Sequence, residues 1–247
     1  MRVDVAPVPP AEPPLDRTCL VVDVLRATSV MAVLFGRGVR ALYPAGSVEE
    51  ARALREELAA EGPVLLCGEV GGLPPDGFDF GNSPGEFASL AALPAERAVV
   101  ATSNGTPALL ACAGAPLTLA AAPLNASAAV ALALEAGRDV LVVCSGLRRE
   151  PAEDDLLAAG LLVARFVELG AEPEAEAEQA LERYRAAADD LAAGLRASEH
   201  GKSLVALGFD HDIDFCAEPD RYDIAGALGI EAGRPVLRPA YPRGGER

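Results

Sequence analysis

One short stretch of the chain has the residue spacing of a serine-hydrolase nucleophile. Gly81-Asn82-Ser83-Pro84-Gly85 matches the G-x-S-x-G pattern, in which the backbone N–H of the residue after the serine helps to form the oxyanion hole. Here that residue is Pro84, which has no N–H. The alternative is that Ser83 caps a helix beginning at Pro84, since Glu86 lies three residues after it. Because a helix start also attracts anions, we expect Asn82 and Ser83 to bind an anionic substrate.

Three other stretches approach known phosphate-handling motifs without completing them. Gly201-Lys202-Ser203 resembles the end of a P-loop, but Arg196 stands where that loop needs its first glycine. Cys144 and Arg149 are one residue short of the C-x5-R phosphatase loop. Asp23 lacks the second aspartate of the D-x-D phosphatase motif. It follows an apolar run, however, and remains a candidate base or ligand.

The two histidines and one acidic pair are further candidate site residues. His200 and His211 are not spaced as a metal-binding pair on a helix, and we expect both to be surface or structural residues. Asp154 and Asp155 open a predicted helix, where negative charge is favoured by the helix dipole. The alternative is that Asp155 ligates a hard metal such as Mg²⁺, which prefers carboxylate oxygens.

The elements that must position these residues are short apolar runs alternating with helical patterns. Such an alternation predicts an α/β fold with three layers, α/β/α, around a largely parallel or mixed sheet. The predicted strands are 20–24, 39–43, 64–67, 98–101, 117–120 and 139–143, and the predicted helices are 27–36, 47 onward, 85–92, 106–113, 125–136, 153–169 and one long helix over 177–195. We expect a single domain over residues 1–247, with a subdivision near residue 170 beyond which the chain is mainly helical. The proline-rich segments 7–14 and 235–242 are predicted to be extended surface segments.

Polar residues follow four of the predicted strands. They lie in segments 23–28, 68–69, 102–106 and 145–146. In open α/β sheets, ligands bind beyond the carboxyl ends of the strands. We therefore expect these four segments to form the binding site.

Composition and charge narrow the class of protein. The net charge of −16 comes with no cluster of Lys or Arg, which argues against nucleic acid as a partner because phosphates must be neutralised. The five cysteines are widely spaced without a C-x-x-C pair, which favours a reduced, cytoplasmic protein over a zinc or disulfide scaffold. The sequence shows no signal peptide or membrane-spanning run, and we expect no membrane partner.

Seven strings, taken in order, resemble the 2-phosphosulfolactate phosphatase (ComB) family. They are VVDVLRATS (21–29), GEVGG (68–72), GFDFGNSP (77–84), TSNGT (102–106), CSG (144–146), the DD…AG run (154–160) and SEHGKSLVALGFDHDIDFCA (198–217). The resemblance implies a family-specific α/β fold and a Mg²⁺-dependent phosphatase acting on phosphate esters of small 2-hydroxy acids, as in coenzyme M biosynthesis. Its partner would be a small anionic substrate. A homodimer is a possible assembly of the chain.

The chain departs from the family pattern at three points. Val70 stands where the family usually has Arg, Asp154-Asp155 where it has Glu-Asp, and Arg149 where it has a glycine. The lost arginine bears on recognition of the second anionic group of the substrate. Arg26, Arg148 and Arg149 are candidate replacements.

The resemblance and the chemistry of phosphate hydrolysis together suggest roles for the site residues. We expect Asp23, Arg26 and Glu69 to be catalytic, and carboxylates of Asp23, Glu69, Asp79 and Asp155 to converge around Mg²⁺, with Asp79 and Asp155 as metal ligands. The expected substrate-binding residues are Thr28, Asn82, Ser83, Asn104, Gly105, Thr106 and Arg148. Either a metal-activated water or Asp23 itself attacks phosphorus, and metal-activated water is preferred because no phosphoenzyme motif is intact.

The sequence is compatible with two other functions. One is a small-anion-binding or regulatory protein of the same fold that lacks turnover, which the Val70 departure motivates. The other is a serine hydrolase built on Ser83, which Pro84 argues against.

Overall fold

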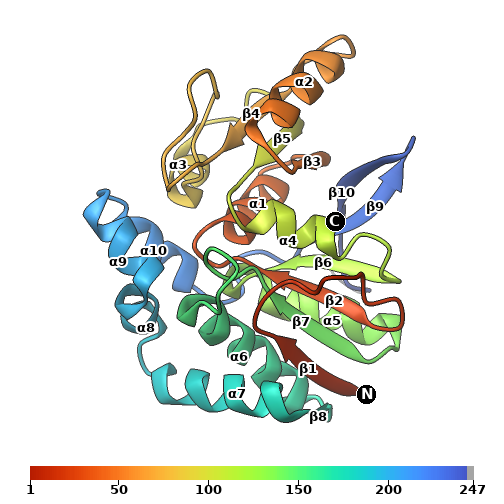
Figure 1. Ribbon diagram of the computed structural model, residues 1–247, viewed down its shortest axis with the longest axis vertical. Coiled ribbons are helices and arrows are strands. Elements are labelled where there is room, and N and C mark those ends of the chain that lie inside the picture. Colours follow the sequence, from red (N-terminus) through yellow and green to blue (C-terminus); the bar gives the residue numbers. More distant parts are fainter. Residues whose placement is uncertain (244–247) are drawn as a thin grey trace.

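The computed structural model describes residues 1–243 and confirms the predicted α/β/α fold, with helices on both faces of one mixed sheet (Figure 1). Within these residues the sheet has ten strands in the order β4-β5-β3-β10-β9-β6-β2-β7-β1-β8. The strands are β1 Arg2–Ala6, β2 Thr18–Val22, β3 Ala41–Ala45, β4 Leu65–Gly68, β5 Arg97–Ala101, β6 Leu117–Ala121, β7 Val140–Cys144, β8 Glu172–Pro173, β9 Ala225–Glu231 and β10 Arg234–Ala240. The six strands predicted from apolar runs correspond to β2 through β7. The prediction of a single domain stays a prediction.

The helices follow the predicted positions closely up to α6. They are α1 Ala27–Gly36, α2 Val48–Ala59, α3 Pro84–Ser89, α4 Gly105–Ala111, α5 Ala126–Ala136, α6 Glu153–Glu168, α7 Ala175–Ala187, α8 Leu191–Ala197, α9 Glu199–Ala206 and α10 Asp210–Ala217, with a 3-10 turn η1 at Pro123–Asn125. No helix in the described part of the chain is both long enough and apolar enough to cross a membrane.

The prediction of one long helix over 177–195 was wrong. The chain forms α7 and α8 instead, because Asp190 begins a new helix: its carboxylate accepts a hydrogen bond from the N–H of Ala193 at 2.9 Å. An aspartate at this position competes with the continuing helix for backbone N–H groups and so favours a cap.

The predicted extended segment over residues 235–242 is extended, but its placement on the surface was wrong, because residues 235–240 belong to β10 inside the sheet. Pro235 and Pro239 are four residues apart in β10, so the two positions that lack an N–H face the same side of the strand. The strand pairs along its whole length with β9 but with β3 at one registered position, Leu237 with Leu42. Prolines are therefore tolerated in β10, because its backbone pairing with one of its two neighbours, β3, is nearly absent.

Two parallel groups of strands flank the β9–β10 hairpin. Strands β4, β5 and β3 are parallel to one another, as are β6, β2, β7, β1 and β8, while the hairpin pairs antiparallel with both groups. Figure 1 shows the first group set at an angle to the second. The two groups run in opposite directions along the sheet. Even so, the segments that follow β2 and β7 lie near the segments that follow β4 and β5.

Buried side chains alternate along β2 and fix it between two helical layers. Leu20 and Val22 pack in the core formed with α5, α6 and α7, whereas Cys19 and Val21 pack in the core formed with α1 and α4. Burial on both faces explains why the strand sequence is fully apolar. It also holds Asp23, the next residue, at the end of a rigid strand.

Candidate active site

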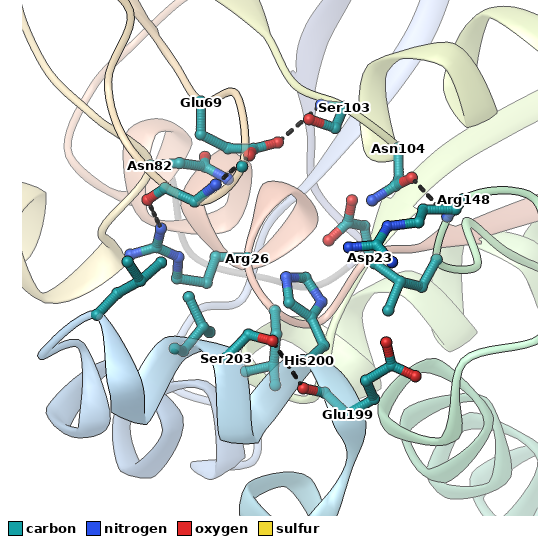
Figure 2. A pocket seen from close by; sticks show the side chains of 16 residues that line it. Asp23, Arg26, Glu69, Asn82, Ser103, Asn104, Arg148, Glu199, His200 and Ser203 are labelled. Carbon is teal, nitrogen blue, oxygen red and sulfur yellow. Dashed lines mark hydrogen bonds between the residues drawn. The ribbon is translucent and has the colours of Figure 1, made fainter.

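A cavity of about 280 Å³ lies where the segments following β2, β4, β5 and β7 meet helix α9 (Figure 2). All four polar segments predicted from strand ends reach it or adjoin it. The polar residues that line it are Asp23, Arg26, Glu69, Asn82, Ser103, Asn104, Arg148, Glu199, His200 and Ser203.

Asp23 lies directly beyond β2 with its side chain at the cavity wall. Its Oδ1 accepts from the N–H of Ala27 at 3.2 Å, and the hydroxyl of Thr28 fixes its backbone through two hydrogen bonds. Burial is the largest cause of a raised pKa of about 6, and the charges of Glu69 and Asp154 add to it, while His200 and the Ala27 N–H oppose it. Asp23 is thus a buried carboxyl that titrates near neutral pH.

Gly105 allows the close approach of α4 to this carboxyl. A Cβ atom placed at residue 105 would lie 2.6 Å from Oδ2 of Asp23, closer than such atoms can come. Gly105 is therefore a packing requirement of the site. Thr106 is fully buried and bonds to Thr102, and neither Thr106 nor Thr28 lines the cavity.

Arg26 also lines the cavity, but most of its side chain is held by the protein. Its Nη1 donates to Oδ2 of Asp212 at 2.7 Å and its Nη2 donates to the carbonyl of Gly72 at 2.8 Å. The guanidinium lies 4.3 Å from the ring centroid of Phe209. Asp212 is fully buried in α10, and sequence reasoning did not single it out.

Ser83 serves the same buried pair. Its hydroxyl donates to Oδ1 of Asp212 at 2.7 Å and accepts from the N–H of Glu86 at 3.2 Å, which confirms the predicted helix cap. A nucleophilic serine needs a base at hydrogen-bond distance, and the partner of Ser83 is a carboxylate already paired with Arg26. Ser83 lines a neighbouring hollow and not the main cavity.

Glu69 reaches the cavity with both carboxylate oxygens engaged. Oε1 accepts from the N–H of Ser103 at 2.7 Å and Oε2 accepts from the N–H of Gly72 at 2.8 Å. Figure 2 shows Glu69 joining these two segments above the cavity. This geometry makes Glu69 a brace between the loops that follow β4 and β5.

The amide side chains at the cavity are less fully bonded. Oδ1 of Asn82 is buried and has no hydrogen-bond partner within residues 1–243. Asn104 accepts a long hydrogen bond of 3.4 Å from the N–H of Arg148. Arg148 itself lies in a tight turn, where Leu147 and Glu150 form a bridge and Arg148 and Arg149 have φ angles of 54° and 69°.

The structure does not bring the two expected metal ligands to the cavity. Asp155 is buried, and its oxygens accept from the N–H groups of Val24 and Gly146 at 3.0 and 2.9 Å and from the hydroxyl of Ser145 at 2.8 Å. Burial first, then the charges of Asp154 and Asp23, raise its pKa well above the ordinary value.

Asp79 lies in the neighbouring hollow. Its Oδ2 accepts from the N–H of Leu66 at 2.8 Å and lies 3.4 Å from Nη2 of Arg55. Over residues 1–243 no three His, Cys, Asp or Glu side chains are grouped as a metal site. The expected convergence of four carboxylates is therefore absent from this structure, and only Asp23 and Glu69 of that set line the cavity.

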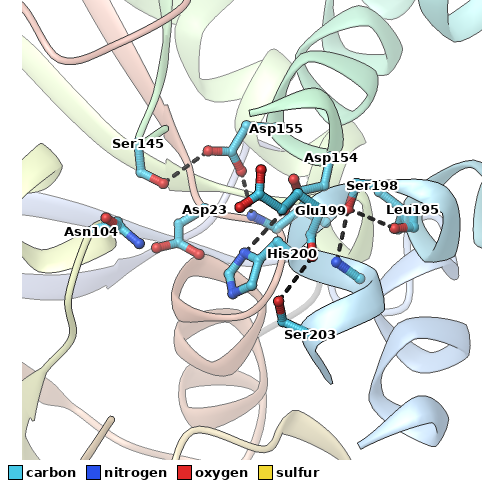
Figure 3. A network of polar contacts seen from close by, with 12 residues as sticks. Asp23, Asn104, Ser145, Asp154, Asp155, Leu195, Ser198, Glu199, His200 and Ser203 are labelled. Atoms are coloured by element: carbon cyan, nitrogen blue, oxygen red, sulfur yellow. Dashed lines mark hydrogen bonds and ion pairs between the residues drawn. The ribbon is translucent and has the colours of Figure 1, made fainter. Parts of the chain in front are cut away.

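His200, which we expected to be a surface or structural residue, lines the cavity from α9 (Figures 2 and 3). Its Nδ1 lies 3.3 Å from Oδ2 of Asp154, whose side chain is 2% exposed. Burial alone would lower the pKa of His200, but the carboxylates of Asp154, Asp23 and Asp155 outweigh it and raise the pKa to about 9. The only sequence signal for His200 was its place in the SEHGKSL string.

Comparison with known proteins adds an independent observation. The family model described as 2-phosphosulpholactate phosphatase matches residues 7–229. The chain is 42% identical over 242 residues to a probable 2-phosphosulfolactate phosphatase of Thermus thermophilus, covering 96% of this chain and 94% of that protein. Proteins of the same description from Deinococcus radiodurans and Thermotoga petrophila are 36% and 34% identical, covering 88% and 86% of this chain and 88% and 89% of their own lengths.

Proposed function

The chain belongs to the 2-phosphosulpholactate phosphatase family, and from this premise we propose that it hydrolyses 2-phosphosulfolactate to sulfolactate and phosphate. Membership makes it a phosphoric monoester hydrolase. The observation that carries the proposal is that one cavity is lined by Asp23, Arg26, Arg148 and His200. A phosphate ester needs this mixture of cationic groups and an acid–base group.

Cationic side chains from two segments would hold the anionic ends of the substrate. Arg26 has N–H groups beyond the two that bond to Asp212 and Gly72, and its guanidinium cannot lose its proton. Arg148 lines the opposite part of the cavity near Asn104 (Figure 2). We assign the phosphate to one and the carboxylate or sulfonate to the other, since bidentate arginine contacts suit all three anions.

Two features of the cavity fit a Mg²⁺ ion. Asp23 is a carboxylate whose Oδ2 accepts no hydrogen bond within residues 1–243, and Oδ1 of Asn82 is a buried oxygen without a donor. Mg²⁺ is usually held by one or two such oxygens together with substrate phosphate and water. Asp23 and Asn82 are therefore the residues that would hold it. When bound, the ion supplies positive charge that neutralises the phosphoryl oxygens and lowers the pKa of water.

The remaining residues keep the cavity in shape. Glu69 ties the loop after β4 to the loop after β5, and Asp155 ties Val24 to Ser145 and Gly146. In our proposal these two carboxylates therefore position the loops that carry Arg26, Asn104 and Arg148 without taking part in the reaction.

The cytoplasm is the compartment we assign to this reaction, as one step of coenzyme M biosynthesis. All five cysteines are buried and unpaired, as expected of a protein kept in a reducing environment.

Phosphate release from purified protein tests the proposal. We expect release from 2-phosphosulfolactate in the presence of Mg²⁺, and loss of release in EDTA with recovery on adding Mg²⁺. 2-Phospholactate and 2-phosphoglycerate, assayed in parallel, identify the tolerated second group. Binding without turnover of all three esters would instead favour an anion-binding protein and overturn the proposal.

A matched pair of arginine variants tests the site. Arg148 lines the cavity and Arg149, the next residue in the same turn, does not. Arg148→Met is expected to raise KM by about 10-fold or more, the loss of one charge-assisted hydrogen bond or more. The rise for Arg149→Met should be much smaller. Equal effects would remove Arg148 from the substrate site.

A further inference from the structure

The proposed reaction assigns no step to His200, which lines the cavity. His200 lies on the second residue of α9, whose first turn is fixed by Ser198: its hydroxyl accepts from the N–H of Gly201 at 2.9 Å. The cap places the imidazole between the cavity and α6 (Figure 3). The position of His200 is therefore set by local structure and not by chance exposure.

Asp154 fixes which nitrogen of the imidazole is free. Oδ2 of Asp154 is buried and has no hydrogen-bond partner of good geometry within residues 1–243, yet Nδ1 of His200 lies 3.3 Å from it. A buried carboxylate without another cation is stabilised when this ring is protonated. With Nδ1 turned to Asp154, the N–H at Nε2 is on the other side of the ring and has no protein partner in the described chain.

Hydrolysis of the ester requires a group that can donate a proton to the leaving oxygen. A 2-hydroxy acid leaves phosphorus as an alkoxide, which is a strong base and a poor leaving group unless it is protonated. Arg26 and Arg148 cannot give up a proton, and Glu69 is fully engaged as an acceptor. Asp23 is assigned to the Mg²⁺ ion in the proposed site, and among the nitrogen-bearing side chains that line the cavity His200 is the one with a proton that it can give up.

We propose that His200 is a catalytic residue that protonates the leaving ester oxygen through Nε2, with Asp154 as its positioning residue. This inference rests on the proposed phosphatase reaction. As the bond between phosphorus and the ester oxygen breaks, a bond forms from phosphorus to a water oxygen. The Nε2 proton passes to the ester oxygen and gives the alcohol. The attacking water releases one proton to solvent and the imidazole takes one back, so that protons balance over the cycle.

The charged groups around His200 support this role. Asp154 and Asp155 face it from α6, Asp23 from the end of β2, and Arg148 and Glu199 share the cavity wall with it. The three aspartates keep the pKa of the ring at about 9, so the ring carries its proton at neutral pH. A protonated imidazole is an effective general acid there.

Changing the leaving group tests the inference directly. 2-Phospholactate and 2-phospho-3,3,3-trifluorolactate have the same tetrahedral carbon, but fluorine makes the second alkoxide a much better leaving group. His200→Gln is expected to lower kcat for phospholactate by about 100-fold or more, the usual scale of general acid catalysis. For the trifluoro ester, the factor by which kcat falls should be at least about 10 times smaller than for phospholactate. Asp154→Asn should show the same selectivity to a lesser degree.

Controls separate the outcomes. His211→Gln removes the other histidine, whose side chain is 64% exposed, and should leave kcat unchanged on both esters. Equal losses on the two esters in His200→Gln would overturn the inference while leaving the phosphatase reaction standing. Absence of phosphate release by the wild type from 2-phosphosulfolactate as well as from these two esters would overturn the proposed function itself.

The wild type offers a second test should His200→Gln not fold. A proton in transfer in the rate-limiting step slows the reaction in D₂O. The solvent isotope effect on kcat is therefore expected to be larger for phospholactate than for the trifluoro ester. The same value for both would contradict proton donation to the leaving oxygen.

Discussion

Two sides of one cavity differ in how completely their polar groups are bonded. On one side, Arg26 and Asp212 form a buried pair in which Asp212 also accepts from Ser83 at 2.7 Å and from the N–H of Gly85 at 3.3 Å. On the other, within residues 1–243, Oδ2 of Asp23 accepts no hydrogen bond, and Oδ2 of Asp154 has His200 as its one ion-pair partner. We call these the bonded side and the open side.

This difference separates the polar groups that stabilise the fold from those that are available to a ligand or a reaction. A buried polar group with all its partners stabilises one arrangement of the chain, whereas one that lacks partners costs free energy and persists where a ligand or a reaction uses it. The pKa values agree, since burial and like charge raise that of Asp23 to about 6. We therefore expect the bonded side to govern stability and the open side to govern turnover.

The largest expected effect is on the bonded side. Asp212→Asn leaves the guanidinium of Arg26 buried without a counterion and should lower the free energy of unfolding by about 3–5 kcal/mol. For a chain of this size, that is a fall in Tm of roughly 2–4 °C per kcal/mol. Calorimetry measures it.

A matched control lies on the same helix. Asp214 pairs with Arg196 at 2.8 Å, but its side chain is 61% exposed. Asp214→Asn should cost at most about 1 kcal/mol, as exposed pairs do. Equal losses of stability in Asp212→Asn and Asp214→Asn would contradict the expectation that the bonded side governs stability.

The next effect is on the open side. Asp23→Asn should lower kcat by at least about 100-fold, the usual scale for loss of an acid–base or charge-stabilising group. Because the ionised form of Asp23 is the one penalised by burial, Tm at pH 8 should stay the same or rise. Steady-state kinetics and calorimetry on the same preparation check both. Near-normal turnover would remove Asp23 from the site.

A smaller effect depends on pH. The pKa of His200 is raised in the folded protein to about 9, above its unfolded value of about 6.5. Its stabilising contribution is then fully present below about pH 6.5 and is lost as pH rises through about 9. The Tm difference between wild type and His200→Gln should therefore be largest at pH 6 and vanish by about pH 10. A difference that grows with pH would contradict the ion pair with Asp154.

Local signals in the sequence were enough to place strands β2 to β7, the helices up to α6 and Asp23. A run of apolar residues predicts a strand that is buried on both faces, so the polar residue that follows it lies at the carboxyl end of that strand. What local signals could not show was convergence. His200 and Asp154 come from helices far from Asp23 in sequence, and their pairing depends on how α9 packs near α6.

The metal ligands illustrate the same limit. Asp79 follows the long loop after β4, and the sequence placed it with the other acidic residues. In the structure the loop returns alongside β4, where the N–H of Asp79 donates to the carbonyl of Leu66 and its carboxylate accepts from the N–H of Leu66. A backbone pairing of this kind depends on the path of the loop, which neither residue type nor spacing encodes.

The smallest expected effect falls on Ser83, the residue with the most suggestive spacing in the sequence. Ser83→Ala removes a helix cap and one of the donors to Asp212, and should cost about 1–2 kcal/mol of stability. The carboxylate keeps Arg26 and Gly85 as donors, so kcat should fall no more than about 3-fold, less than 1 kcal/mol. A nucleophilic serine predicts the opposite: near-total loss of turnover with little change in Tm. Measuring both quantities on this variant assigns Ser83 to the bonded side or to the chemistry, because each role moves a different one.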